Sequence, residues 1–212
     1  MWVYFTIGTM KQSELETGSI YSEEEERVLG PWQRIRQSVL TPIAAVLSWL
    51  GISPDMLSYT SVILGIGFCL LAPIEFTLAF WFLVASVICD GLDGVEARLT
   101  RNNTARGSFT DMFCDQAVVA FTVAGMAWKG SIHPVLAILF VYTYTAITIF
   151  LMLHRMLRIS SRWIVRPSRM ILYIAIGLYF VFRIDLLNTL LLVDLFAFPL
   201  LLLSFRRLRR AL

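Results

Sequence analysis

Four aspartates lie close together in the chain, between two long apolar stretches: Asp90, Asp93, Asp111 and Asp115. In helices, the first two would share a face because they are three residues apart, and the last two because they are four apart. A charged side chain at the centre of a membrane helix costs about 2.5–3.5 kcal/mol. We therefore expect these carboxylates to face the interior of a helix bundle and to meet cations there.

Four carboxylates that converge repel one another unless cations neutralise them. Their oxygens suit hard cations such as Mg²⁺, Mn²⁺ or Ca²⁺. Two such ions, each bound to oxygens, are a recurring arrangement for in-line displacement at phosphorus. Nearby arginines can bind phosphate oxygens. This pattern predicts metal-dependent chemistry on a lipid-linked phosphate, and the simpler alternative is that the acids only mark helix ends at the membrane boundary.

The composition indicates a membrane protein. Of the 212 residues, 58% are hydrophobic and the mean hydropathy is +0.72, whereas soluble domains average about 45–50% apolar residues. The net charge of +3 leaves no large basic field for nucleic acid. Cys69, Cys89 and Cys114 form no CxxC pair, and we interpret them as apolar packing residues.

The apolar pattern predicts an all-α integral membrane protein. Residues 1–30 are expected to be an acidic cytosolic tail, and residues 31–212 a membrane domain. Within that domain, 31–51 is too short for a typical span of about 20 residues, so we expect an interfacial amphipathic helix, with a short first span as the alternative. Six transmembrane helices should follow, near 55–74, 76–99, 106–128, 132–155, 168–184 and 186–205.

The arginines indicate the orientation of these six helices. Basic residues concentrate near 98–106, in 155–169 and in 206–210, whereas the opposite loops hold little more than Lys129 and Arg183. Basic loops usually face the cytosol. We therefore expect a multi-pass protein of the cell (inner) membrane with both termini and the active site on the cytoplasmic side.

The aspartate tract resembles the signature of the CDP-alcohol phosphatidyltransferase family, D-x2-D-G-x2-A-R-x8-G-x3-D-x3-D. Every fixed position and gap agrees, at Asp90, Asp93, Gly94, Ala97, Arg98, Gly107, Asp111 and Asp115. A weaker likeness lies in "ISPDMLS" at 52–58, which resembles the family's P-N-x-[IL]-[ST] turn with Asp55 in place of Asn. An interfacial helix before six spans also fits this family, so the resemblance covers most of residues 31–212.

The resemblance implies an enzyme of phospholipid biosynthesis. Such a transferase moves the phosphatidyl group from CDP-diacylglycerol to the hydroxyl of a small polar alcohol and releases CMP, with two Mg²⁺ or Mn²⁺ ions as cofactors. By the same resemblance, the metal ligands are Asp90, Asp93, Asp111 and Asp115, the general base is Asp115, and the CDP site includes Gly94, Ala97, Arg98 and Gly107. Members of the family often form homodimers, which leaves a homodimer open.

The acceptor alcohol is less clearly indicated. Family members that use phosphorylated acceptors place basic residues in the region that corresponds to 154–170, often after an R-A-E element. Here Arg155 is followed by Met156, and Arg166 and Arg169 resemble the later basic positions. We expect these three arginines to bind an acceptor phosphate, with membrane anchoring as the alternative. A phosphorylated polyol is the first candidate acceptor and serine the next.

Three other functions stay open at this point. The same signature serves enzymes that transfer a CDP-linked choline or ethanolamine head group to diacylglycerol. A cluster of intramembrane acids can also belong to an ion transporter, or to a non-catalytic protein that binds metal or lipid. An ion path would not need the set formed by Gly94, Ala97, Arg98 and Gly107, which favours the enzyme.

Overall fold

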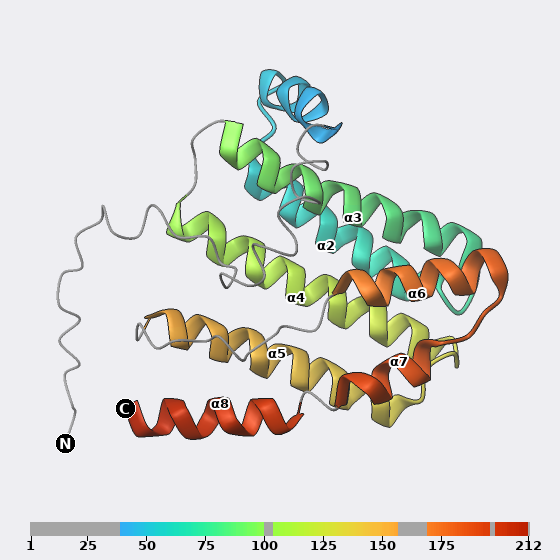
Figure 1. Cartoon of the computed structure of the whole chain (residues 1–212). Helices are drawn as coiled ribbons and strands as arrows, with labels where there is room; N and C mark the ends of the chain where they lie inside the picture. The colour runs from blue at the N-terminus through green and yellow to red at the C-terminus, as the bar shows by residue number, and fades with distance from the viewer. Residues whose placement is uncertain (1–38, 100–103, 157–168, 196–197, 212) are drawn as a thin grey trace.

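The computed structural model describes residues 39–99, 104–156, 169–195 and 198–211, and all its regular elements there are helices. The expected acidic tail at 1–30 lies outside the described residues. A first helix spans Val39–Trp49. The others are α2 (Pro54–Leu71), α3 (Phe76–Leu99), α4 (Ala105–Trp128), α5 (Pro134–Met156), α6 (Arg169–Phe182), α7 (Leu187–Asp194) and α8 (Phe198–Ala211), as Figure 1 shows.

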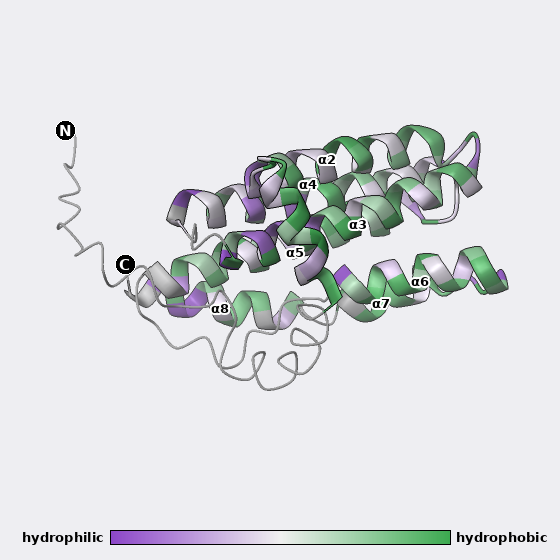
Figure 2. Ribbon diagram, turned by 90° about the horizontal axis from the view of Figure 1, so that it is seen from above, coloured by the Kyte–Doolittle hydropathy of each residue, from purple (hydrophilic) through white to green (hydrophobic). Residues whose placement is uncertain are grey.

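The predicted all-helical membrane character is confirmed, but the predicted number of six spans is not. Among the described residues, α2, α3 and α5 are long and apolar enough to cross a membrane. Hydrophobic residues run along most of their length in Figure 2. Helix α4 is as long as α3, at 24 residues, but its first half carries Asp111 and Asp115. Helix α6 has only 14 residues.

The sixth apolar stretch forms two helices instead of one. Helix α7 ends at Asp194, and α8 begins at Phe198 with Pro199 as its second residue. Proline lacks the N–H that a continuous helix would need there, and its ring clashes with the carbonyl four residues earlier. In the first helical turn the same ring is tolerated. Pro199 therefore fits the first turn of α8 and would not fit the interior of one continuous helix.

Small residues bring α2 and α4 close together. A Cβ atom on Gly125 of α4 would lie 2.8 Å from the Cα atom of Cys69 on α2, and one on Gly65 would lie 3.5 Å from the Cα of Val118. Such small residues permit close helix packing in a membrane. Because α3 also packs against α2, the carboxyl end of α3 and the start of α4 lie at the same end of the bundle (Figure 1).

Two further contacts complete the surroundings of this end. The first helix packs its buried Ala44 against Leu57 of α2 and Leu92 and Val95 of α3. Helix α6 lies along α3 in Figure 1, and its Phe180 ring stacks on Phe80 with centroids 4.1 Å apart. The start of α6 is thereby directed toward the aspartates of α3.

Candidate metal centre

Three of the four aspartates converge. Asp90 and Asp93 project from the last turns of α3 and Asp111 from the first turns of α4. Each offers a carboxylate oxygen, and these oxygens all lie within 4.8 Å of one another. Asp93 is buried, with 4% of its surface exposed, and the other two are half-buried. The helical spacing and the packing of α3 and α4 on α2 produce this convergence.

The donor set fits a hard divalent cation. It consists of carboxylate oxygens only, which is the ligand chemistry of Mg²⁺ and Mn²⁺. Asp90, Asp93 and Asp111 would hold such an ion, each through one carboxylate oxygen.

A serine hydroxyl orients the most buried of these carboxylates. Ser58 of α2 donates a hydrogen bond of 2.6 Å from its Oγ to Oδ2 of Asp93. Ser61 in turn donates to the carbonyl of Ser58, and Ser86 of α3 donates to the carbonyl of Ser61. These hydroxyls fix α2 against α3 beside the carboxylates.

The start of α4 is capped at the edge of the carboxylate cluster. Thr104 is the N-cap residue, and its Oγ1 accepts a hydrogen bond of 3.0 Å from the N–H of Gly107. A Cβ atom on Gly107 would lie 3.3 Å from that oxygen and 4.0 Å from Oδ1 of Asp55. A side chain at Gly107 would therefore crowd the Thr104 cap of α4 but would meet Asp55 only at ordinary contact distance.

The surroundings of Gly94 are more open. A Cβ atom there would meet only the guanidinium nitrogens of Arg98, at 3.7 and 3.9 Å. Arg98 is exposed. Apart from this guanidinium, the space beside Gly94 is open within 4 Å.

Arg169, the first residue of α6, connects two of the aspartates. Its Nη1 and Nη2 donate to Oδ1 and Oδ2 of Asp90 at 3.0 and 2.9 Å. Its Nη1 also forms an ion pair with Oδ1 of Asp115. The three side chains expose between 10% and 17% of their surfaces, so this arrangement is largely shielded from solvent. Asp115 thus lies beside the three converging carboxylates, held through the arginine.

A family model for CDP-alcohol phosphatidyltransferase matches residues 51–201, which include every residue of this centre. The chain belongs to this family. The membership expected from the signature at 90–115 is therefore confirmed. Two curated relatives are CDP-diacylglycerol--serine O-phosphatidyltransferases from two Helicobacter pylori strains. They are 42% (strain J99) and 40% (strain 26695) identical to this chain over 72 residues. These matches cover 34% of this chain and 30% of the length of each relative.

The residues expected from the family signature have different surroundings in the structure. Asp90, Asp93 and Asp111 lie together, whereas Asp115 is not one of these three oxygen donors. Its expected roles as a fourth ligand and as the base stay predictions, as do the CDP-binding roles of Gly94, Ala97, Arg98 and Gly107. Of the three arginines expected at the acceptor, only Arg169 has a described side chain, and it contacts aspartates. Arg166 and the side chain of Arg155 lie outside the described part.

Two buried polar residues of α2 and α3, Ser58 and Glu96, were not predicted from the sequence. Ser58 is the last residue of the "ISPDMLS" turn, and its place in that turn was the available signal. Glu96 lies one turn after Asp93 on α3 and is 1% exposed. Its position within the family signature, three residues after an aspartate, could have indicated a further buried carboxyl group.

Proposed function

We propose that this chain is a metal-dependent phosphatidyltransferase of phospholipid biosynthesis. It would transfer the phosphatidyl group of CDP-diacylglycerol to the hydroxyl of a small polar alcohol and release CMP. The observation that carries this proposal is the convergence of Asp90, Asp93 and Asp111 within 4.8 Å, inside the matched family region.

In this reaction the side chains have separate tasks. Asp115 takes the proton of the acceptor hydroxyl, and the resulting oxygen attacks the phosphorus nearer the lipid. A new P–O bond forms as the bond to the CMP oxygen breaks, and CMP leaves with that electron pair. The open space beside Gly94 and the exposed Arg98 would accommodate the nucleotide and its phosphates.

Asp90, Asp93 and Asp111 would hold Mg²⁺ or Mn²⁺, and Ser58 would keep the Asp93 carboxylate in its ligating orientation. When bound there, divalent cations neutralise the diphosphate and stabilise the charge on the leaving CMP. The family's two-ion arrangement would need Asp115 as an additional ligand. Arg169 would then have to release the oxygen of Asp115 that it contacts.

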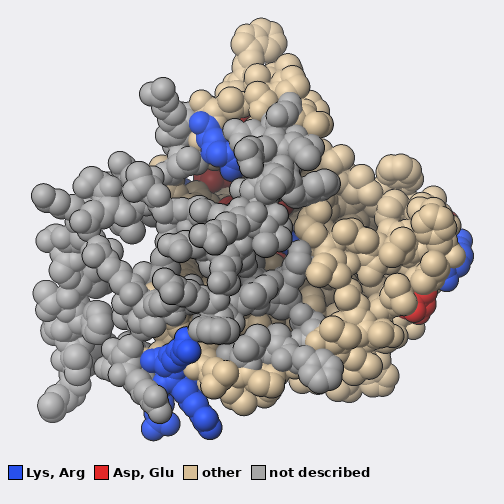
Figure 3. Space-filling view, viewed as in Figure 1, with Lys and Arg blue, Asp and Glu red and all other residues tan. Residues whose placement is uncertain are grey.

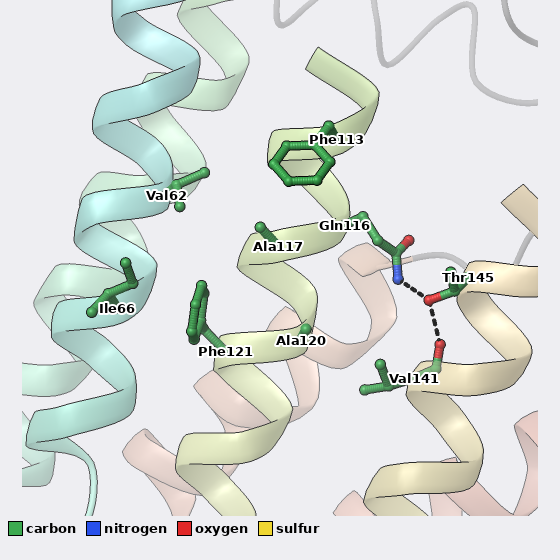
Figure 4. Close-up of a pocket in the computed structure, with 9 residues that line it drawn as sticks. All are labelled: Val62, Ile66, Phe113, Gln116, Ala117, Ala120, Phe121, Val141 and Thr145. Atoms are coloured by element: carbon green, nitrogen blue, oxygen red, sulfur yellow. Dashed lines mark hydrogen bonds between the residues drawn. The ribbon is translucent and has the colours of Figure 1, made fainter. Parts of the chain in front are cut away.

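An apolar cleft supports a lipid substrate. It has a volume of about 450 Å³ and lies between α2, α4 and α5, with Phe113, Ala117 and Phe121 of α4 on one wall (Figure 4). Its polar residues are Gln116 and Thr145, and the amide of Gln116 donates to Oγ1 of Thr145. Gln116 directly follows Asp115, so the cleft lies along the same helix that carries two of the aspartates. An acyl chain of CDP-diacylglycerol fits such a surface.

Serine is the acceptor that we place first. The partial relatives carry the name CDP-diacylglycerol--serine O-phosphatidyltransferase. In addition, Arg169 is engaged by Asp90 and Asp115, which weakens the argument for a ready-made site for an acceptor phosphate. A phosphorylated polyol is the second candidate acceptor.

We also propose that the centre faces the cytoplasm in a multi-pass protein of the cell (inner) membrane. The carboxyl end of α8, where Arg206, Arg207 and Arg209 are exposed, lies toward the same end of the molecule as the start of α4 in Figure 1. Figure 3 shows a group of basic side chains at the lower left of the same view. Basic residues of membrane proteins concentrate on the cytoplasmic side.

The test is CMP release by the purified full chain in detergent. CDP-diacylglycerol and Mn²⁺ or Mg²⁺ would be supplied with serine, inositol phosphate, glycerol phosphate, inositol or choline. We expect metal-dependent CMP release with one acceptor, lost in Asp115→Asn and retained in Asp185→Asn, a matched change in the loop between α6 and α7. No CMP release with any acceptor would contradict the proposal. A product formed only from CDP-choline and diacylglycerol would establish the reverse type of transfer.

A further inference from the structure

The contact between Arg169 and Asp90 uses the atoms that a metal ion would use. Both oxygens of Asp90 accept hydrogen bonds from the guanidinium, at 3.0 and 2.9 Å. One oxygen of Asp90 also belongs to the group of carboxylates that lie within 4.8 Å of one another. A planar guanidinium matches a carboxylate in this two-bond geometry and keeps its charge at any physiological pH. Arg169 and a divalent cation are therefore competitors for Asp90.

The same arginine neutralises part of the acidic cluster. Asp90, Asp93, Asp111 and Asp115 place up to four negative charges at the adjoining ends of α3 and α4. Arg169 pairs with one carboxylate on each helix. Like charges at these distances repel strongly where water is largely excluded. A cation from α6 thus lowers the repulsion between α3 and α4 when no metal ion is present.

We propose that Arg169 is an exchangeable counter-ion, which pairs with Asp90 and Asp115 in the metal-free protein and is displaced by a divalent cation. This inference rests on the metal centre of the proposed function and does not depend on the acceptor. It makes Arg169 a positioning residue that controls cation affinity. Displacement of Arg169 would also release Asp115, the proposed base.

The experiment measures Mn²⁺ binding to the full chain in detergent without substrate, by the loss of the free Mn²⁺ signal in electron paramagnetic resonance. Arg169→Gln removes the charge and leaves a shorter polar side chain. Arg207→Gln removes an exposed charge on α8 and serves as the matched control. We expect about tenfold tighter Mn²⁺ binding in Arg169→Gln, because a neighbouring positive charge repels a divalent cation. Arg207→Gln should bind as the unchanged chain does.

Stability without metal gives a second measurement. In EDTA, Arg169→Gln should unfold at a lower temperature than the unchanged chain, and saturating Mn²⁺ should remove most of that difference. Adding Asp90→Asn to Arg169→Gln should restore part of the stability in EDTA, because it removes one of the repelling charges. Arg169→Lys keeps the positive charge without the two-bond geometry. Its unfolding temperature in EDTA should lie between those of the unchanged chain and Arg169→Gln.

Each outcome decides the matter. If a folded Arg169→Gln protein binds Mn²⁺ as tightly as the unchanged chain or more weakly, the counter-ion role is overturned. The metal centre itself is still supported in that case, provided that the unchanged chain binds Mn²⁺. If Arg169→Gln does not fold, tighter binding by Arg169→Lys supports the role, and equal or weaker binding overturns it. If neither the unchanged chain nor the variant binds Mn²⁺, the metal centre of the proposed function fails and the counter-ion role falls with it.

Discussion

The hydrogen bond from Ser58 to Asp93 provides a sharp test of how the carboxylates are oriented. Ser58→Ala removes one oxygen atom and leaves the α2 backbone unchanged, since alanine is favourable in a helix. The hydroxyl is 2.6 Å from Oδ2 of Asp93, which is a typical length for a charge-assisted O–H···O⁻ bond. Ser58 is 3% exposed and Asp93 4%, so water has little access to replace the lost donor.

The size of the effect follows from the charge on the acceptor. Hydrogen bonds to charged groups contribute about 1.5–3 kcal/mol. At about 1.4 kcal/mol for each factor of ten, this range corresponds to about 10–150-fold in an equilibrium constant. Loss of outer partners of metal ligands typically lowers metal affinity or activity by about 10–100-fold. We therefore expect Ser58→Ala to bind Mn²⁺ about 10–100-fold more weakly and to release CMP correspondingly more slowly at limiting metal.

The assay pairs Mn²⁺ titration with CMP release over a range of Mn²⁺ concentrations. Ser61→Ala is the matched control, because Ser61 is also buried but donates to the backbone carbonyl of Ser58. It should leave Mn²⁺ affinity unchanged. Ser58→Thr keeps the hydroxyl and should restore binding. The reasoning is refuted if Ser58→Ala binds Mn²⁺ like the unchanged chain, or if Ser61→Ala weakens binding as much.

Two other substitutions test the ligand set and the helix packing. Asp111→Asn removes the negative charge of a proposed ligand and should weaken Mn²⁺ binding by more than the factor of about 10–100 expected for an outer partner. Binding equal to that of the unchanged chain would contradict this. Gly125→Ala would place a Cβ atom 2.8 Å from the Cα of Cys69 and should destabilise the protein by about 1–3 kcal/mol in thermal unfolding followed by circular dichroism. Gly177→Ala meets nothing within 4 Å and should not destabilise it, so equal losses in both variants would disprove the packing argument.

The helices were largely predictable from the sequence. The apolar stretch expected at 76–99 coincides with α3, and the stretch expected at 106–128 differs from α4 by one residue at its start. Long apolar runs bounded by polar and turn residues carry a strong signal. The break between α7 and α8 was missed because hydropathy continues through it. Pro199 was the local signal for that break.

The centre was predictable only where its parts are close in sequence. The spacing of Asp90 and Asp93 indicated a shared helix face, and the family signature linked them to Asp111. The pairing of Asp90 with Arg169 joins residues 79 positions apart. It depends on how α6 packs against α3, and no local pattern encodes that packing. Ser58 reaches Asp93 for the same kind of reason, through the packing of α2 on α3.

The aspartates and Arg169 differ in how closely the helices that carry them are packed, and this difference bears on function. The carboxylates stand on α3 and α4, which both pack on α2, where Gly65 and Gly125 allow close approach. Arg169 stands at the very start of α6, whereas the ring contacts between α6 and α3 lie at its far end, where Tyr179 and Phe180 meet Phe76 and Phe80. A residue at a helix terminus moves more easily than one inside a packed helix. A firmly held carboxylate cluster beside a less firmly held arginine is the arrangement that an exchangeable counter-ion requires.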